Sequence, residues 1–131
     1  MSEPQDRPEQ AGASTRSQVE ALIEEARRLL ASDWRAAGVL VQKALEMDPS
    51  NLVAKSIRAM AHDRKREEDV VQCFATVRQL RAAKDLKGAL AEADRWLADY
   101  PLEPRLIQLR ELLAKELQAA WEAWNAQLAA P

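Results

Sequence analysis

The chain has 131 residues, of which 47% are hydrophobic and 31% are charged, so it can bury a modest core and is too apolar for a disordered protein. The formal net charge of −2 excludes a general attraction to nucleic acid. A single cysteine, Cys73, excludes an internal disulfide. The chain is rich in Ala, Leu, Glu, Arg and Lys, which favours helix over sheet.

Residues 1–17 hold acids and two prolines and contain no apolar run, so they do not form a signal peptide. No stretch of the sequence approaches the roughly 20 apolar residues that cross a bilayer. We therefore expect a cytoplasmic protein with a disordered leader over residues 1–17, a single domain over residues 18–131, and no contact with membranes.

The first two predicted helices follow from hydrophobic spacing and from capping residues. Apolar residues recur every three or four positions from Val19 to Leu30, which predicts an amphipathic helix. Asp33 can accept hydrogen bonds from the first amides of a second helix, predicted over residues 34–47. Pro49 ends that helix because it lacks an amide hydrogen and disfavours helical geometry in the residue before it.

Three more helices are predicted in the rest of the chain. The third begins after Ser50 or Asn51 and meets no proline or glycine before Gly88. The fourth covers about residues 86–99, and the last starts near Pro104, a residue favoured in the first helical turn. The apolar stripe of the last helix consists of Leu106, Leu109, Leu113, Leu117, Ala120, Trp124 and Leu128. The sequence therefore predicts an all-α fold of about five helices.

Two segments of the chain align without a gap at a displacement of 52 residues. They are DWRAAGVLVQKALEMDP, residues 33–49, and DLKGALAEADRWLADYP, residues 85–101. Each begins with an aspartate, carries small residues near its start and ends with a proline. The small residues are Ala37 with Gly38 and Ala89 with Gly88. Because small residues on a helix leave room for a neighbour, we expect another helix to approach closely at both places.

These segments resemble the second helix and closing proline of the tetratricopeptide repeat (TPR), a helix-turn-helix unit of about 34 residues. The residues that match the small positions and the proline of that family are Ala26, Ala37, Ala44 and Pro49 in the first copy, and Val77, Ala89 and Pro101 in the second. Trp96 departs from the pattern, because it stands at a position where that family has a small residue. The resemblance implies two TPR-like helix pairs joined through a long charged helix, with a C-terminal capping helix. The long charged helix is also similar to helical tails of some bacterial signalling proteins.

The second copy starts about 18 residues later than a repeat of about 34 would place it. The stretch HDRKREED, residues 62–69, lies within this delay. We favour a solvated, continuous helix against which nothing packs, and a hinge is the alternative. Nucleic-acid binding is disfavoured because acids directly follow the basic residues. The two halves of this helix are expected to pack through Val53, Ile57 and Met60, and through Cys73, Val77 and Leu80.

Motifs for catalysis, metal binding or cofactor binding are absent from the sequence. His62 and Cys73 would lie roughly 16 Å apart along a helix, too far to share a proton. We therefore expect no enzyme activity, no cofactor and no metal.

The resemblance implies a binding groove lined by the first helix of each pair. The residues that map onto it and favour an acidic peptide or another protein are Arg27, Phe74, Arg78, Arg81 and Arg105. The alternative is that these arginines are ordinary solvated side chains. The sequence thus predicts a protein-protein interaction module, an adaptor or scaffold without catalysis.

Trp121 and Trp124 share one face of the last helix. We expect them to cover the exposed side of the last repeat, as a capping helix does. The alternative is a patch that binds a partner, since tryptophan is common at binding hot spots. A homodimer, formed through the long helix or through the Trp121/Trp124 face, is the alternative to the adaptor function.

Overall fold

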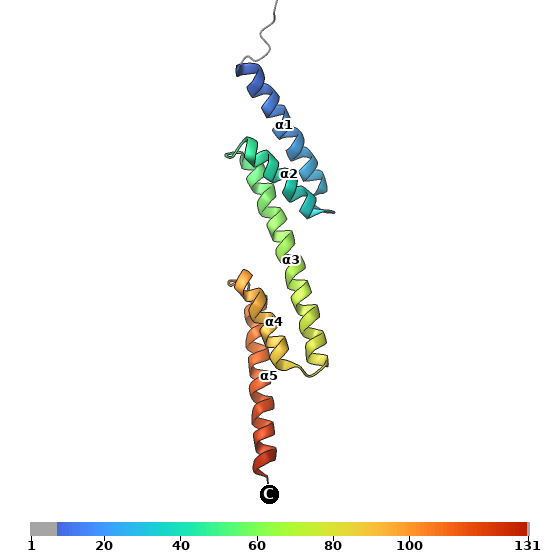
Figure 1. The fold of residues 1–131 in the computed structure, drawn as a ribbon, viewed down its shortest axis with the longest axis vertical. Helices are drawn as coiled ribbons and strands as arrows, with labels where there is room; N and C mark the ends of the chain where they lie inside the picture. The colour runs from blue at the N-terminus through green and yellow to red at the C-terminus, as the bar shows by residue number, and fades with distance from the viewer. Residues whose placement is uncertain (1–7, 131) are drawn as a thin grey trace, which may run out of the picture. The chain divides into compact units, whose positions relative to one another are not determined.

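The computed structural model describes residues 8–130, and these residues form five helices and no strand (Figure 1). The helices are α1 (Pro8–Leu29), α2 (Trp34–Met47), α3 (Leu52–Ala82), α4 (Leu86–Asp99) and α5 (Pro104–Ala129). The all-α prediction, with long third and fifth helices, is confirmed. Helix α3 is continuous through residues 62–69, as the sequence predicts.

Helix α1 begins earlier than the sequence pattern indicates. Residues 8–17, which were expected in the disordered leader, are helical, and residues 1–7 of that leader lie outside the described part of the chain. Pro8 stands at the first helical position, where its fixed φ angle suits the helix and its missing amide hydrogen costs nothing. The first core residue of α1 is Val19, so hydrophobic spacing alone does not reveal this extension.

The described chain forms two compact helical units that divide between Lys65 and Arg66. The first unit contains α1, α2 and the first part of α3. The second contains the remainder of α3, α4 and α5. Each unit has a core formed by three helices, and α3 contributes to both cores.

Helices α2 and α4 begin in the same way, as the duplicated segments predict. The Asp33 carboxylate accepts a hydrogen bond from the amide of Ala36 at 3.1 Å, and the Asp85 carboxylate accepts one from Gly88 at 2.8 Å. Each bond satisfies an amide that the first helical turn leaves without a partner. Both helices end directly before a proline-containing turn, so the predicted boundaries of both are confirmed.

Four of the nine buried residues that form the core of the first unit are alanines. Its buried residues are Val19, Ile23, Ala26, Ala37, Val41, Ala44, Leu45, Ala54 and Ile57. The face predicted for the first part of α3 is wrong at two of three positions, because Val53 and Met60 are exposed while Ala54 and Ala61 are buried.

The core of the second unit contains larger side chains. Its buried residues are Val70, Cys73, Val77, Ala89, Ala93, Leu106, Leu109 and Leu113. Cys73 and Val77 are buried as predicted, and Leu80 packs against this core with part of its surface exposed. Trp96 packs there too, and its indole N–H donates to Glu92 at 2.9 Å.

The two glycines of the duplicated segments do not have the role predicted for them. A Cβ atom at Gly38 would have no other atom within 4 Å, so no helix approaches closely at this position. A Cβ atom at Gly88 would collide with the Asp85 carboxylate, which caps the same helix. The close contacts are instead made at Ala37 and Ala89, which are both fully buried.

Candidate functional site

The described residues contain no group of three or more metal-ligating side chains. Every helix among them is too short or too polar to span a membrane. His62 is exposed and Cys73 is fully buried. Burial raises the pKa of the Cys73 thiol to about 11, and the negative charge of Glu92 adds to this effect. Its surroundings therefore keep Cys73 in the unreactive thiol form.

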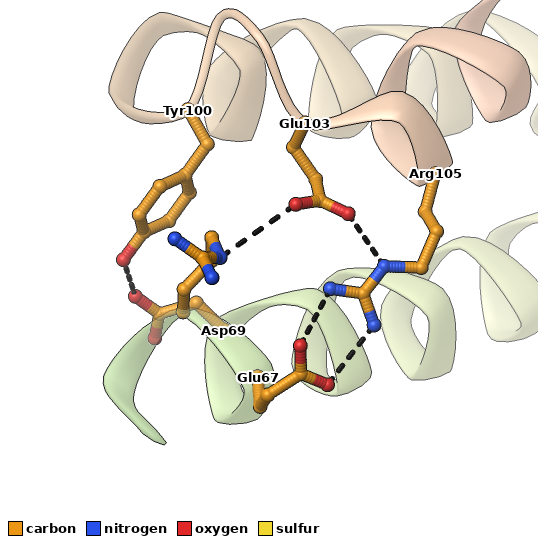
Figure 2. Close-up of polar contacts among 6 residues, drawn as sticks. Glu67, Asp69, Tyr100, Glu103 and Arg105 are labelled. Atoms are coloured by element: carbon orange, nitrogen blue, oxygen red, sulfur yellow. Dashed lines mark hydrogen bonds and ion pairs between the residues drawn. The ribbon is translucent and has the colours of Figure 1, made fainter. Parts of the chain in front are cut away.

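A polar network in the second unit joins the start of α5 to α3 (Figure 2). The Arg105 guanidinium donates two hydrogen bonds to the Glu67 carboxylate, at 3.0 and 2.7 Å, and one to Glu103 at 2.5 Å. Such paired geometry makes arginine-carboxylate contacts stronger and more directional than single ion pairs. Arg105 thus fixes the position of α5 on α3.

The turn between α4 and α5 is held by the same part of α3. The Tyr100 hydroxyl donates to the Asp69 carboxylate at 2.5 Å, and the Arg66 side chain lies 3.7 Å from Glu103 (Figure 2). The expectation that nothing packs against residues 62–69 is therefore wrong for their second half. The sequence shows these charges but does not show that the turn from Tyr100 to Glu103 lies beside them.

The pKa values of the Glu67 and Glu103 carboxyl groups lie below their ordinary value of 4.5, chiefly because Arg105 donates hydrogen bonds to both. In the unfolded chain these carboxyl groups regain ordinary values. The stability that the contacts contribute is therefore present above pH 4.5 and is lost as the pH falls through the lower folded-state values.

We expect the free energy of unfolding to fall between about pH 5 and pH 3, and to fall less steeply in an Arg105→Met variant, which keeps the stem of the side chain and removes the charge. Urea unfolding followed by circular dichroism at several pH values measures both slopes. Equal slopes for the variant and the unmodified chain would show that the Arg105 contacts do not govern the acid sensitivity.

The residues predicted to line a binding groove are divided between the two units. Arg27 belongs to the first unit, and the other four belong to the second. Arg27 lies 3.7 Å from Glu24 on its own helix, and Arg81 donates two hydrogen bonds to Glu116 of α5, at 3.1 and 2.5 Å. The others are exposed Arg78, partly buried Phe74 and Arg105 of the network above. A partner for Arg81 or Arg105 would compete with contacts that stabilise the fold.

The second half of α5 carries an exposed apolar face, which we call the tryptophan face and define as Leu117, Trp121, Trp124 and Leu128. The two indole rings stack with centroids 5.3 Å apart, and they are 55% and 51% exposed. All residues from 118 to 130 are exposed. The expectation that the tryptophans cover the last repeat is therefore wrong, since Leu106, Leu109 and Leu113 cover it instead.

A groove of about 680 Å³ lies between α2 and the first part of α3, within the first unit. We call it the α2–α3 groove. Trp34, Gly38 and Val39 line it from α2, and Ala61 and His62 line it from α3. Its volume falls within the range of pockets that bind ligands. The sequence does not predict this groove. The sequence pattern predicts a close helix contact at Gly38, whereas the missing side chain of Gly38 leaves a gap in the surface of α2.

The α2–α3 groove carries more positive than negative charge. Arg35, Lys43 and Lys65 line it as cations, and Glu46 is the one carboxylate among its lining residues. The Arg35 guanidinium stacks on the Trp34 ring at 4.3 Å from the ring centre.

Comparisons of this chain with protein-family models, with curated proteins and with solved structures find no match. The tryptophan face and the α2–α3 groove are therefore the observations from which a function can be argued.

Proposed function

We propose that this protein is a non-catalytic helical interaction module, with two TPR-like helix pairs, that binds a partner protein through the tryptophan face of α5. The exposed, stacked pair of Trp121 and Trp124 is the observation that carries this proposal. Large apolar side chains side by side on an exposed stretch of helix, here residues 118–129 of α5, are typical of a binding surface. A cytoplasmic location, in which the thiol of Cys73 stays reduced, forms part of the proposal.

The spacing of the tryptophan face supports a helical or grooved partner. Its residues follow one another at steps of four, three and four, which places all of them on one side of α5. A tryptophan buries about 150–250 Å² when a partner covers it fully, at about 25 cal/mol for each Å² of apolar surface. Two half-exposed tryptophans can therefore supply several kcal/mol of binding free energy, before the costs of association.

The charges near this face favour a protein over a membrane surface. Glu122 is the one charged residue between positions 117 and 130. Helices that lie on anionic membranes carry lysine and arginine on their polar side, and this segment has neither. With Glu122 as the one charge, this segment also offers little electrostatic repulsion to another helix.

Self-association is a second candidate function, favoured by the same spacing. Steps of four and three repeat every seven residues, which is the pattern of a short coiled-coil seam. Two copies of α5 could pair along their tryptophan faces, because Glu122 is the one charged side chain that either helix would bring to the contact. The resulting homodimer would bury the same residues as a partner protein.

A double variant, Trp121→Ala with Trp124→Ala, tests both functions. Leu112→Ala is the matched control, because Leu112 is 47% exposed on α5 but lies outside the tryptophan face. Cross-linked capture from the native source is expected to recover proteins with the unmodified chain and with the control, and to lose them with the double variant. For an identified partner, hot-spot behaviour predicts a loss of affinity of about 30-fold or more.

Light scattering at tens of micromolar protein separates the two candidates. A mass above that of the monomer, returning to the monomer mass in the double variant, supports self-association. A monomer that loses its captured partners in the double variant supports the adaptor function. If neither the mass nor the captured proteins respond to the double variant, the tryptophan face is not the binding surface.

A further inference from the structure

The missing side chain of Gly38 leaves apolar space in the α2–α3 groove. At the displacement of 52 residues, Gly38 of α2 corresponds to Leu90 of α4. Leu90 packs against the core of the second unit, whereas a Cβ atom at Gly38 would have no other atom within 4 Å. The first unit therefore has open space, beside Trp34 and Val39, at a position where the second unit places a leucine side chain.

The positive charge of the α2–α3 groove is largely engaged within the chain. Arg35 stacks on Trp34, and Lys65 has an interaction of its own within the chain. The other two charged residues, Lys43 and Glu46, stand three positions apart on α2 and carry opposite charges. Because a charged occupant would lose water without gaining an ionic partner, the groove favours an uncharged, apolar occupant.

The tryptophan face is an uncharged apolar surface on the same chain. The indole rings of Trp121 and Trp124 stack on each other and are about half exposed. Residues 123–130 include no charged side chain, and Glu122 accepts a hydrogen bond from Gln118 at 3.0 Å. Each copy of the chain thus carries one apolar groove and one apolar face, in equal numbers.

We propose that the α2–α3 groove of one copy of the chain receives the tryptophan face of a second copy, with an indole ring over Gly38. The proposal rests on self-association, the second candidate function above, and assigns its contact as face in groove. In a closed dimer each copy inserts its own face and receives the face of the other, so the dimer contains this contact twice.

The buried area favours this arrangement over pairing of two tryptophan faces. The exposed parts of Trp121, Trp124 and Leu128 amount to roughly 200–350 Å² of apolar surface. Two such faces packed on each other would bury roughly 400–700 Å² in all, below the 1,200 Å² or so at which specific interfaces begin. Two face-in-groove contacts would bury about twice as much, roughly 800–1,400 Å², which reaches that range.

Two variants remove one side of the contact each. Gly38→Leu fills the groove and keeps the tryptophan face, whereas Trp121→Ala with Trp124→Ala, the double tryptophan variant, keeps the groove. The unmodified chain is expected to form a dimer in light scattering at tens of micromolar protein. Each variant alone is expected to be a monomer under the same conditions, because neither can form the contact with itself.

Mixing the two variants restores one contact, since the face of one meets the groove of the other. Unlabelled Gly38→Leu chain, added to the isotope-labelled double tryptophan variant, is expected to shift the amide NMR signals of Gly38, Ala61 and their neighbours, with an affinity tighter than about 1 mM. Unlabelled double tryptophan variant, added in the same way, is expected to leave these signals unchanged.

A substitution at the edge of the groove serves even if Gly38→Leu folds poorly. Val39 lines the groove and is 57% exposed, so Val39→Glu is expected to keep the fold. It places a charge against the entering indole rings and is expected to weaken the dimer at least tenfold. Val71→Glu is the matched control, because Val71 is 66% exposed on α3 and lies outside the groove. This control is expected to leave the dimer unchanged.

The outcomes separate this proposal from the functions argued above. A dimer that persists in Gly38→Leu and Val39→Glu, but not in the double tryptophan variant, would overturn the face-in-groove contact and keep self-association through paired faces. A monomeric unmodified chain that captures a partner through the tryptophan face would overturn the proposal and support the adaptor function. Unchanged amide signals in the mixture of the two variants would also overturn the proposal.

Discussion

Truncation of Leu113 to alanine is expected to lower the free energy of unfolding by about 2–5 kcal/mol. Leu113 is fully buried on α5, in the core that α3, α4 and α5 share within the second unit. Removing its branched end loses apolar burial and leaves a cavity that rigid helices fill only in part. Alanine is also a good helix former, so the cost reports on packing and not on helix propensity.

The neighbouring residue offers a control with the same chemical change. Leu112 is 47% exposed, so Leu112→Ala is expected to change the free energy of unfolding by no more than about 0.5 kcal/mol. Urea unfolding followed by circular dichroism compares the two variants. Similar costs at both positions would mean that the core of the second unit does not lie where the burial pattern places it.

Helix boundaries were the most predictable part of the fold. Asp33 and Asp85 cap helices, and Pro49 and Pro101 follow them, because these residues act through local backbone chemistry that needs no tertiary context. The start of α1 was less predictable. A helix can extend beyond its last core residue without any apolar repeat, as residues 8–17 do before Val19.

Assignment of the buried face was less secure where alanine is abundant. Val53 and Met60 are more hydrophobic than Ala54 and Ala61, so the periodicity of α3 favours the wrong face by one position. Alanine is buried there while its more hydrophobic neighbour is exposed. Hydrophobicity alone therefore does not decide which residue of an alanine-rich helix lies inside.

The extent to which the last helix is buried depends on the length of the neighbouring helix, which the apolar pattern of the last helix does not give. The apolar stripe of α5 continues without a break from Leu106 to Leu128. Helix α5 has 26 residues, about 39 Å, whereas α4 has 14 residues, about 21 Å, so α4 can cover only about half of it. Periodicity predicts which side of a helix is apolar, but not whether a neighbour is long enough to bury it.

The candidate sites were the least predictable, because they depend on which elements lie side by side. The charges of Arg66, Glu67 and Asp69 are visible in the sequence, but their contacts with the α4–α5 turn come from tertiary packing. The α2–α3 groove leaves one trace in the sequence. The two copies of the repeat differ there, with Gly38 in the first and Leu90 in the second, whereas small residues near the start of both copies predict a close helix contact.

The thiol of Cys73 is expected to react with a disulfide reagent at pH 8 at least about 100-fold more slowly in the folded chain than in denaturant. Desolvation raises its pKa to about 11 from an ordinary value of 9.0. Since the thiolate is the reactive form, two pH units correspond to about 100-fold less of it at a given pH. Full burial adds a steric barrier, so reaction requires an opening of the second unit.

Moving the thiol by one residue supplies the control for this experiment. Gln72 is exposed on α3, and a variant with Gln72→Cys and Cys73→Ala is expected to react nearly as fast folded as unfolded. Leu113→Ala destabilises the same core, so it is expected to accelerate the reaction of Cys73. Where the core opens and closes faster than the thiol reacts, the rate is expected to rise about tenfold for each 1.4 kcal/mol of lost stability. Equal reaction rates for the thiols at positions 72 and 73 would contradict the burial of Cys73. An unchanged rate for Cys73 in Leu113→Ala would show that the reagent reaches the thiol without opening of the core that contains Leu113.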